Sequence, residues 1–343
     1  MVSTGGLATR RGKVSKFATI GVAGAGAWGL ALANAAAAAG RAVVVWGRDA
    51  DALAALARTR TSAHLPGVAL APAATVASEI GALAAADALL LVVPAQAARA
   101  AAARLAERLA PRPLIVCAKG IERGSQRFMT EVVAEAAPGW PAAILSGPSF
   151  AADVAAGLPT AVTLASVDEA LARALSAALS GPNLRLYHST DPRGVEIGGA
   201  AKNVLAIACG VVAGLGLGAS AGSALIARGF AELRRFAAAF GARPTTLMGL
   251  SGLGDLVLTC STAQSRNFAF GQALGRGASV AEASAGKLVE GALTAAALMQ
   301  MARARAVEMP ISAAVEALID GRIDAAHTVG ALLARPLKGE DDA

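Results

Sequence analysis

Residues 17–49 read FATIGVAGAGAWGLALANAAAAAGRAVVVWGRD, and they carry the strongest structural signal in the chain. The apolar start, Phe17–Ala23, ends in glycines, as a buried parallel strand does before a tight turn. The alanine-rich run Leu30–Ala39 predicts a helix that ends at Gly40. Arg41–Trp46 contains three consecutive valines and predicts a second strand. This order predicts the first unit of a parallel sheet.

The same alternation continues to about residue 190. Asp49 stands where an N-cap belongs, directly before a helical run. Further helices are predicted over Ala50–Ala57, Ala97–Leu109 and Glu169–Leu179, and further strands over Ala88–Val93, Leu114–Ala118, Ala142–Leu145, Thr160–Ala165 and Leu184–His188. Strands that alternate with helices predict an α/β Rossmann-type fold with a doubly wound parallel sheet.

The pattern changes after Ser189. From Asp191 to about Leu333 the sequence shows helical runs punctuated by Gly and Pro, and no convincing strand. The 343 residues also exceed the roughly 250 that one hydrophobic core serves. We therefore expect a disordered N-terminal tail over 1–16, a Rossmann domain over 17–190, an all-helical C-terminal domain over 191–335 and a C-terminal tail over 336–343.

Composition and charge narrow the class of protein. Aromatic residues make up only 3%, which argues against stacking platforms for single-stranded nucleic acid. The formal net charge is +7, and part of it comes from Arg10, Arg11, Lys13 and Lys16. That segment has no apolar core of a secretory signal, so a disordered tail or an over-long start is favoured over a targeting role. The other positive charges are scattered, and no nucleic-acid partner is expected.

Cysteines and histidines give no sign of a metal site. They stand far apart, as Cys117, Cys209, Cys260, His64, His188 and His327. An odd number of cysteines without CxxC spacing is typical of reduced thiols in a cytoplasmic protein. Neither a zinc site nor a Ser/His/Asp triad is indicated.

One uncharged stretch, residues 203–227, is long enough to cross a bilayer. It contains five glycines, at Gly210, Gly214, Gly216, Gly218 and Gly222. Glycine at this density weakens a single continuous helix. We therefore favour two buried helices joined by a glycine-rich turn over an integral membrane span.

The glycines Gly24, Gly26 and Gly29 form a GxGxxG motif that follows a strand and opens a helix. In such a motif the first glycine permits the tight turn, the second lets the backbone approach a pyrophosphate, and the third allows close packing of helix and strand. The helix N-terminus then offers free N–H groups to the anion. This context favours a dinucleotide site over a glycine-rich turn without a ligand.

The end of the second strand bears on which dinucleotide binds. NAD sites usually place Asp or Glu there to hold the ribose 2′-hydroxyl. Here the strand ends in Trp46, Gly47 and Arg48. Gly47 leaves room, and Arg48 can make charge-assisted hydrogen bonds to a 2′-phosphate. Asp49 is better explained as a helix cap, so NADPH is the expected cofactor, with NADH possible as a second.

Several later strands end in polar or glycine-containing clusters, at Pro94, at Lys119-Gly120 and at residues 146–150, which read SGPSF. Ligands of open parallel sheets bind beyond the carboxyl ends of the strands, so these clusters should meet in one crevice. Lys119 is then a cation beside the ligand. The alternative is a surface lysine with a buried stem.

The C-terminal half adds a second lysine, Lys202, followed by the uncharged stretch. It either reaches solvent from a helix end or is buried for chemistry, and burial lowers a lysine pKa toward neutrality. Asp255 could orient a lysine, or cap a helix. Arg266 suits a phosphate, or is an ordinary solvated arginine.

Together these segments closely resemble bacterial NAD(P)-dependent glycerol-3-phosphate dehydrogenase from about Phe17 to Leu333. The resemblance is carried by GAGAWGLALA (24–33), VVVWGRD (43–49), LLLVVP (89–94), AKG (118–120), SGPSFAADVAAGLPTAVTLAS (146–166), GGAAKN (198–203), ALIARG (224–229), GLSGLGDLVLTC (249–260), QSRN (264–267) and VEG (289–291). It implies reduction of dihydroxyacetone phosphate to sn-glycerol 3-phosphate in the cytoplasm, for phospholipid synthesis. We also expect a homodimer.

The resemblance also implies residue roles. Lys202 would be the catalytic acid–base, and Lys119, Asn203, Asp255 and Thr259 would surround the reacting centre. Substrate would be held by Lys119, Gly147, Ser149, Lys202, Asp255, Ser265, Arg266 and Asn267. The cofactor would contact Gly24, Gly26, Ala27, Trp28, Gly29, Arg48, Lys119, Ala151, Arg266, Leu288 and Glu290.

Two rival functions share the expected fold. One is a two-domain dehydrogenase acting on a hydroxy acid or a sugar acid, which would not need Arg266 together with both lysines. The other is a non-catalytic NADPH-binding sensor, which could dispense with the proton donor Lys202.

Overall fold

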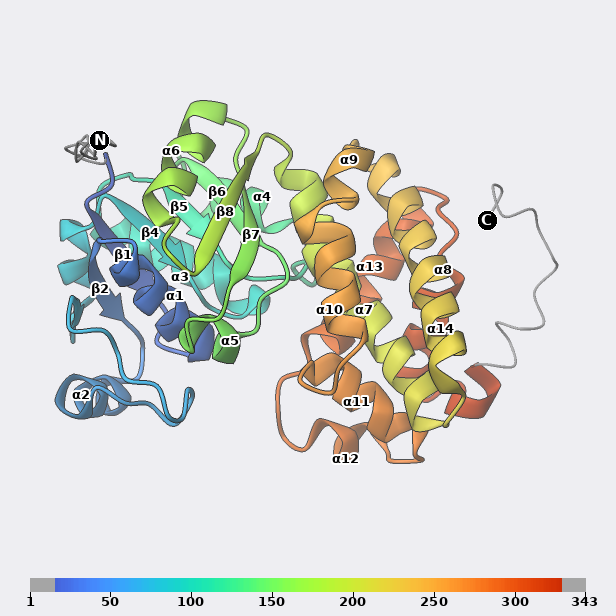
Figure 1. Ribbon diagram of the computed structural model, residues 1–343. Helices are drawn as coiled ribbons and strands as arrows, with labels where there is room; N and C mark the ends of the chain where they lie inside the picture. The colour runs from blue at the N-terminus through green and yellow to red at the C-terminus, as the bar shows by residue number, and fades with distance from the viewer. Residues whose placement is uncertain (1–15, 329–343) are drawn as a thin grey trace, which may run out of the picture.

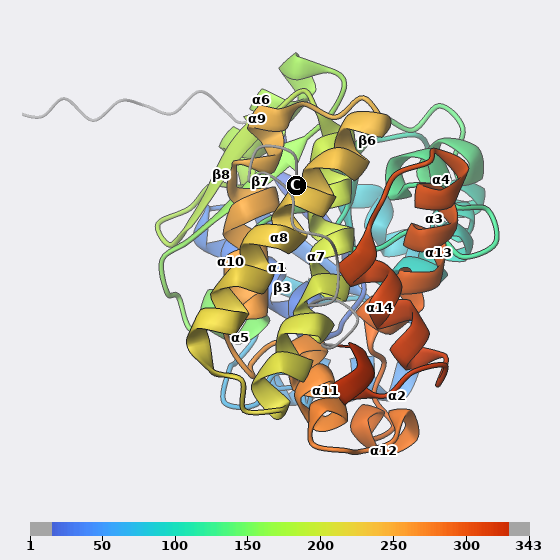
Figure 2. The same ribbon diagram turned by 90° about the vertical axis from the view of Figure 1, so that its right-hand side faces the viewer.

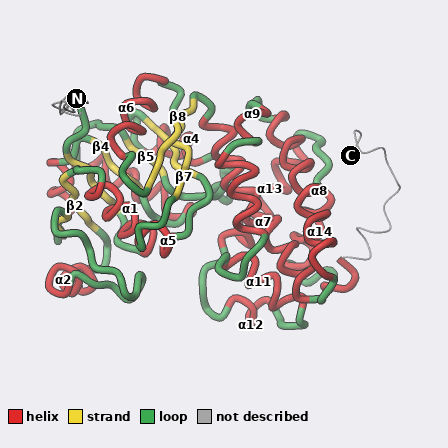
Figure 3. Tube along the Cα trace, in the orientation of Figure 1, coloured by secondary structure: helices red, strands yellow, loops and turns green. Residues whose placement is uncertain are grey.

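The computed structural model describes residues 16–328 and has two parts, a sheet flanked by helices and a bundle of helices (Figure 1). Both predicted tails lie outside the described residues, apart from Lys16. All strands of the described residues lie in the first part, as Figure 3 shows. The strands are β1 (Thr19–Ala23), β2 (Ala42–Trp46), β3 (Ala74–Val76), β4 (Ala88–Leu91), β5 (Leu114–Val116), β6 (Ala142–Ser146), β7 (Thr160–Ala165) and β8 (Leu184–Ser189).

Helices connect these strands. They are α1 (Ala27–Ala38), α2 (Ala50–Thr59), α3 (Ala98–Arg108), α4 (Met129–Ala136), α5 (Ala151–Ala155) and α6 (Glu169–Leu179), with 3₁₀ turns η1 (Ile80–Ala85) and η2 (Ala95–Ala97). The predicted helix cap is confirmed, because Oδ1 of Asp49 accepts a hydrogen bond from the N–H of Ala52 at 2.9 Å. The sequence prediction missed β3, α4 and α5, which are short.

The sheet has the strand order β3-β2-β1-β4-β5-β6-β7-β8. Its strands are parallel except that β6 and β7 pair antiparallel, with Ser146 opposite Thr163. The predicted Rossmann-type fold is confirmed, and the sheet departs from the predicted parallel arrangement at this pair. The connection after β6 contains only the five-residue helix α5, which packs against α1. The chain stays at the carboxyl edge of the sheet, and β7 starts from that edge in the opposite direction.

Both faces of the sheet are covered, which is why its central strands are apolar without a break. In β4, for example, Leu90 joins the core on one face of the sheet and Leu89 and Leu91 join the core on the other face. All three side chains are at most 1% exposed. This rigid sheet fixes the loops that follow β1, β5 and β6.

The second part contains no strand between residues 191 and 328. Its helices are α7 (Pro192–Gly214), α8 (Gly218–Ala239), α9 (Pro244–Leu247), α10 (Asp255–Cys260), α11 (Arg266–Gly275), α12 (Val280–Ser284), α13 (Glu290–Ala304) and α14 (Pro310–Ile319), with a π-helical turn η3 (Leu250–Gly254) before α10. Figure 2 views this part from its outer side, where α7 runs behind α8 and between the other helices.

Helix α7 is the centre of the helical part, and its residues from Gly194 to Val212 are all buried. It is long and apolar enough to cross a membrane, but 89% of its most apolar window is buried inside the protein. A helix that is apolar all round is typical of such a core position. The predicted glycine-rich turn falls between Gly214 and Gly218. The prediction that both flanking helices are buried was wrong for α8, whose first turns are largely exposed.

The glycines of α7 allow close helix packing. A Cβ atom on Gly210 would lie 2.1 Å from the carbonyl oxygen of Phe268, and one on Gly271 of α11 would lie 2.0 Å from that of Ile207. Gly214 and Gly275 meet in the same way, since a Cβ on Gly214 would lie 2.9 Å from the Cα of Gly275. These glycines therefore bring the backbones of α7 and α11 together, which places the start of α11 near the middle of α7.

Candidate active site

Lys202 lies in the middle of α7, and its residue is only 5% exposed. Its ammonium nitrogen donates hydrogen bonds to Oδ1 of Asp255 at 2.5 Å and to Oγ1 of Thr259 at 2.8 Å. Lys202 is therefore not a lysine that reaches solvent from a helix end, which was the alternative interpretation. Its position deep in a helix core makes it a candidate for chemistry.

Asp255 binds a second lysine with its other oxygen. Nζ of Lys119, which follows β5, donates to Oδ2 of Asp255 at 2.7 Å and to the carbonyl oxygen of Gly147 at 2.9 Å. Asp255 is the first residue of α10 and is 1% exposed, and it does not act as a helix cap. We call Lys119, Lys202, Asp255 and Thr259 the lysine cluster. It joins two cations from different parts of the fold through one carboxylate.

The surroundings of Lys202 change its acidity. Burial lowers the pKa of Lys202 to about 7, because the buried site disfavours the charged form. Asp255 opposes this shift, and the positive charge of Lys119 adds to it. An amine with a pKa near neutrality can both give and take a proton at physiological pH.

Two glycines of α7 make room for this arrangement, and sequence reasoning did not single them out. A Cβ on Gly199 would lie 2.6 Å from Oγ of Ser146, at the end of β6, and one on Gly198 would lie 2.4 Å from the carbonyl oxygen of Ser251. Any larger residue would push α7 away from the sheet and from η3. The signal that could have revealed them is the GG pair one turn before Lys202.

An amide network links the lysine cluster to the start of α11. Nδ2 of Asn267 donates a hydrogen bond to Oδ1 of Asn203 at 3.0 Å. Oδ1 of Asn267 accepts a hydrogen bond from the N–H of Gly291 at 2.9 Å. Asn203 donates in turn to the carbonyl oxygen of Lys119 at 3.3 Å. Both asparagines are over 90% buried. Their amides are therefore engaged with protein groups and hold α7, α11 and α13 at fixed positions.

The N-terminus of α11 is a candidate anion site beside this network. Ser265 caps the helix, since its hydroxyl accepts from the N–H of Phe268 at 3.3 Å. The next residue, Arg266, is exposed. An exposed arginine on the first turn of a ten-residue helix combines its own charge with the free N–H groups of the helix end.

The loop after β6 contributes Gly147 and Ser149. Gly147 has a φ of +151°, and a Cβ there would lie 2.8 Å from the Cα of Val162 on β7. The hydroxyl of Ser149 donates to the carbonyl oxygen of Gly147 at 3.0 Å. Since that carbonyl also accepts from Lys119, the loop is tied directly to the lysine cluster.

The glycine loop of β1 and α1 fits a dinucleotide. Gly24 has a φ of +132°, and a Cβ there would meet the carbonyl oxygen of Val92 at 2.0 Å. A Cβ on Gly29 would lie 1.8 Å from the carbonyl oxygen of Gly24, so the helix packs directly on the turn. Gly26 faces open space and caps α1 without a side-chain hydrogen bond. The free N–H groups of α1 can therefore receive a pyrophosphate.

The other expected cofactor residues lie on several elements of both parts. Ala27 and Trp28 open α1, and Ala151 opens α5, which packs on α1. Arg48 is exposed directly after β2 and makes no hydrogen bond or ion pair with a described residue. Glu290 begins α13, and its pKa is raised by burial, while the charge of Arg266 opposes the shift. Leu288, two residues earlier, is 42% exposed.

The structure thus brings most of the expected catalytic and substrate residues together. Hydrogen bonds connect Lys119, Gly147, Ser149, Lys202, Asn203, Asp255, Thr259 and Asn267 into one group. Ser265 and Arg266 adjoin this group in the chain. Within residues 16–328, no hydrogen bond or ion pair joins Arg48 or Leu288 to the lysine cluster. In the same range, no group of His, Cys, Asp and Glu has the arrangement of a metal site.

Comparisons with known proteins agree along the whole described chain. Two family models match, the N-terminal part of NAD-dependent glycerol-3-phosphate dehydrogenase over residues 19–172 and its C-terminal part over residues 191–330. A relative from Methylobacterium radiotolerans named glycerol-3-phosphate dehydrogenase (NAD(P)+) is 63% identical over 94% of this chain and 98% of its own. A relative of the same name from Azorhizobium caulinodans is 60% identical over 95% of this chain and 100% of its own. The crystal structure of glycerol-3-phosphate dehydrogenase from Coxiella burnetii is 37% identical, with a TM-score of 0.88, and covers 93% of this chain and 100% of its own.

Proposed function

The chain belongs to the NAD-dependent glycerol-3-phosphate dehydrogenase family, and from that premise we propose that Lys202 is the proton donor of its reaction. The reaction is the NAD(P)H-dependent reduction of dihydroxyacetone phosphate to sn-glycerol 3-phosphate. The observation that carries the proposed role is the contact of Asp255 with both lysines, at 2.5 and 2.7 Å. It holds two cationic groups where a ketone oxygen gains negative charge.

The protein supplies the proton and the electrostatic setting. Reduction of a ketone to an alcohol needs a hydride at carbon, which a bound nicotinamide supplies, and a proton at oxygen. The Lys202 ammonium group gives that proton, while Asp255 and Thr259 hold its nitrogen in place. Lys119 adds a second positive charge, which stabilises the developing alkoxide. After transfer, Lys202 is left as a neutral amine, a form that its pKa of about 7 makes accessible.

The phosphate of the substrate is assigned to Arg266 and the first turn of α11. The exposed guanidinium can bind phosphate oxygens in a bidentate manner, and the helix end adds backbone N–H groups. Asn267 and Asn203 connect this turn to Lys119. The network fixes the distance between the bound phosphate and the two lysines. The site therefore selects a substrate by its length as well as by its charge.

The glycine loop, Ala27, Trp28, Arg48, Ala151, Leu288 and Glu290 are assigned to the cofactor. The open position at Gly26 and the uncapped N-terminus of α1 support the pyrophosphate site. The side chain of Arg48 is exposed and has no hydrogen-bond or ion-pair partner among residues 16–328, which supports a preference for NADPH over NADH.

Consumption of NADPH tests this assignment. We expect rapid, saturable oxidation of NADPH with dihydroxyacetone phosphate and formation of sn-glycerol 3-phosphate. Cofactor binding without turnover would indicate the non-catalytic sensor. Turnover with other carbonyl compounds, such as the keto acids that correspond to a hydroxy acid, but not with the phosphorylated ketone, would indicate the rival dehydrogenase.

The pH dependence tests the role of Lys202. Its pKa of about 7 means that the ammonium form dominates at lower pH. Ketone reduction needs this form, so kcat for reduction should be level below pH 7 and fall by about tenfold per pH unit above it. Oxidation of sn-glycerol 3-phosphate needs the neutral amine and should show the opposite dependence. Parallel profiles in both directions, measured in steady state, would contradict the proposal.

Replacement of Arg48 tests the cofactor preference. Arg48→Ala should weaken NADPH binding by roughly 2 kcal/mol, about 30-fold, because one charge-assisted contact is lost. NADH has no 2′-phosphate, so its binding should change little. The check is a fluorescence titration of both cofactors with the variant and with Arg58→Ala, which removes an exposed arginine at the end of α2. Equal weakening of both cofactors would show that Arg48 does not read the phosphate.

Three further expectations remain part of the proposal. We infer a homodimer, a cytoplasmic location and a role in supplying glycerophospholipid synthesis. We also infer that the chain divides near residue 190, where the last strand ends and α7 begins. Mass determination in solution checks the homodimer, and limited proteolysis checks the division.

A further inference from the structure

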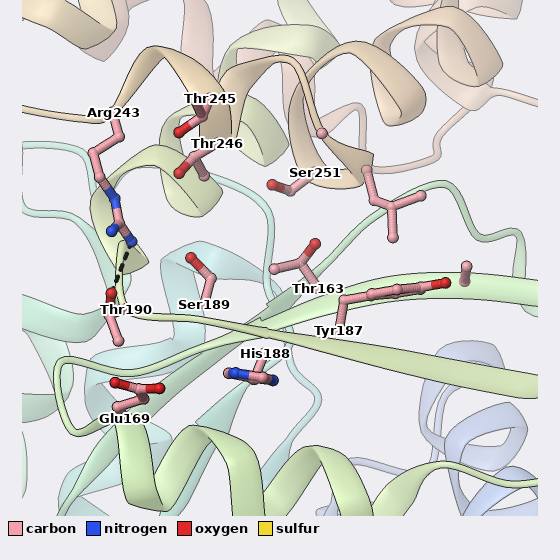
Figure 4. Close-up of a pocket in the computed structure, with 13 residues that line it drawn as sticks. Thr163, Glu169, Tyr187, His188, Ser189, Thr190, Arg243, Thr245, Thr246 and Ser251 are labelled. Carbon is pink, nitrogen blue, oxygen red and sulfur yellow. Dashed lines mark hydrogen bonds between the residues drawn. The ribbon is translucent and has the colours of Figure 1, made fainter.

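A cleft lies between the sheet and the helical part (Figure 4). Its volume is about 610 Å³. One wall consists of β7, β8 and the turn after β8, and the other wall consists of α9, η3 and the residue before α9. The lining shares no residue with the proposed catalytic, substrate or cofactor sets.

Each of the two walls carries a hydroxyl group of a largely buried residue that lines the cleft. Ser251 on η3 is 1% exposed and Thr163 on β7 is 9% exposed, and both line the cleft. Neither hydroxyl makes a hydrogen bond to a described residue. Figure 4 shows them on opposite walls, with Thr246 beside Ser251. Both hydroxyls open to the cleft, where a bound group with polar atoms can accept hydrogen bonds from them.

A cation, Arg243, lies in the wall formed by the helical part. Nη2 of Arg243 donates to Oγ1 of Thr190 at 2.9 Å, a contact between the two walls that Figure 4 marks. Asp191 is the acid closest to this guanidinium, with Oδ2 at 3.8 Å from Nε, but its two oxygens already accept backbone N–H groups at 2.9 Å. The side chain of Arg243 is 52% exposed, so donors remain free on the cleft side.

The acid on the rim does not cancel this charge. Glu169 is paired with Arg173 at 2.8 Å, one turn along α6. Figure 4 shows Glu169 and the ring of His188 below the strands, on the side of α6, while Arg243 lies above them. The cleft therefore offers a half-exposed guanidinium, whose contact with Asp191 is long at 3.8 Å, together with hydroxyl donors from two opposite directions.

We propose that this cleft is a second binding site for a phosphate group, either free phosphate or that of a small phosphate ester. Donors from two opposite walls and from Arg243 approach from directions that a tetrahedral oxyanion can satisfy together, whereas a planar carboxylate accepts mainly within its own plane. The bound group contacts η3, which ends at Gly254, next to Asp255. The site is distinct from the substrate phosphate site at Arg266.

A single reporter makes the proposal testable. The chain has one tyrosine, Tyr187, and this residue lines the cleft and is 49% exposed. Incorporation of 3-fluorotyrosine gives one ¹⁹F resonance that reports on the cleft. Inorganic phosphate and glycerol 2-phosphate are titrated separately at constant ionic strength, in an Arg266→Ala background that weakens the substrate site. We expect a saturable shift with a midpoint on the order of 1 mM, and the tighter ligand identifies the source of the phosphate group.

Variants decide whether the shift arises in the cleft. Arg243→Gln should raise the apparent Kd by about tenfold or more, and Ser251→Ala by roughly threefold. Arg276→Gln, which removes an exposed arginine after α11, should leave the Kd unchanged. A linear, non-saturating response, an equal response to acetate, or an unchanged Kd in both Arg243→Gln and Ser251→Ala would overturn the proposal. Ser251→Ala keeps the test valid if Arg243→Gln fails to fold.

Discussion

Lys202→Met should lower kcat for ketone reduction by roughly 10²–10⁴-fold, while NADPH binding stays close to that of the unmodified chain. Methionine approximates the length of the lysine side chain but cannot donate a proton. The fold should persist, because Asp255 keeps Lys119 as a partner at 2.7 Å and no buried carboxylate is left without a cation. Steady-state kinetics and a cofactor titration measure the two effects separately.

A matched control uses the same substitution at an exposed site. Lys16→Met, just before β1, removes a lysine with no role in the site and should leave kcat unchanged. Turnover of Lys202→Met at the rate of the control would refute the assignment of Lys202. A loss of NADPH binding in parallel with kcat would show that the lysine has a structural role instead of a chemical one.

Asp255→Asn should have the second largest effect, because it removes the carboxylate that holds both lysines. We expect kcat to fall by about 10²-fold or more, since neither cation is then fixed at the reacting oxygen. The free energy of unfolding should also fall, by about 3–5 kcal/mol, as is usual when one partner of a buried ion pair is lost. Asp255 is 1% exposed, so water cannot replace it readily.

The pH dependence of kcat distinguishes a direct effect of Asp255 on Lys202 from a loss of activity caused by lower stability. Asp255 favours the charged form of Lys202, so its loss should lower the pKa of Lys202 further. The fall in reduction rate should then begin at lower pH than in the unmodified chain. Asp51→Asn, an exposed change in the first turn of α2, serves as the control for kcat and for unfolding. If the reduction rate of Asp255→Asn begins to fall at the same pH as in the unmodified chain, Asp255 does not influence the pKa of Lys202.

The glycine loop of the cofactor site could be predicted from the sequence because it depends only on neighbouring residues. Gly24, Gly26 and Gly29 are needed where a strand meets a helix, and that order can be read from apolar periodicity. The same holds for the cap at Asp49 and for the change to helices after Ser189. The antiparallel direction of β7 could not be predicted from the sequence. Strand direction depends on the path of the preceding connection, and that path leaves no periodic pattern in the strand itself.

The sequence by itself determined the order of strands and helices, the glycine turn and the types of residue available for chemistry. Tertiary structure alone decided which groups meet: Lys202 and Asp255 are 53 residues apart in the chain, and Lys119 and Asp255 are 136 apart. The local sequence specifies backbone conformation and apolar faces, and those act over a few residues. The meeting of the charges depends on how closely α7 packs against β6, η3 and α11, and the close contacts at Gly198, Gly199 and Gly210 set that distance.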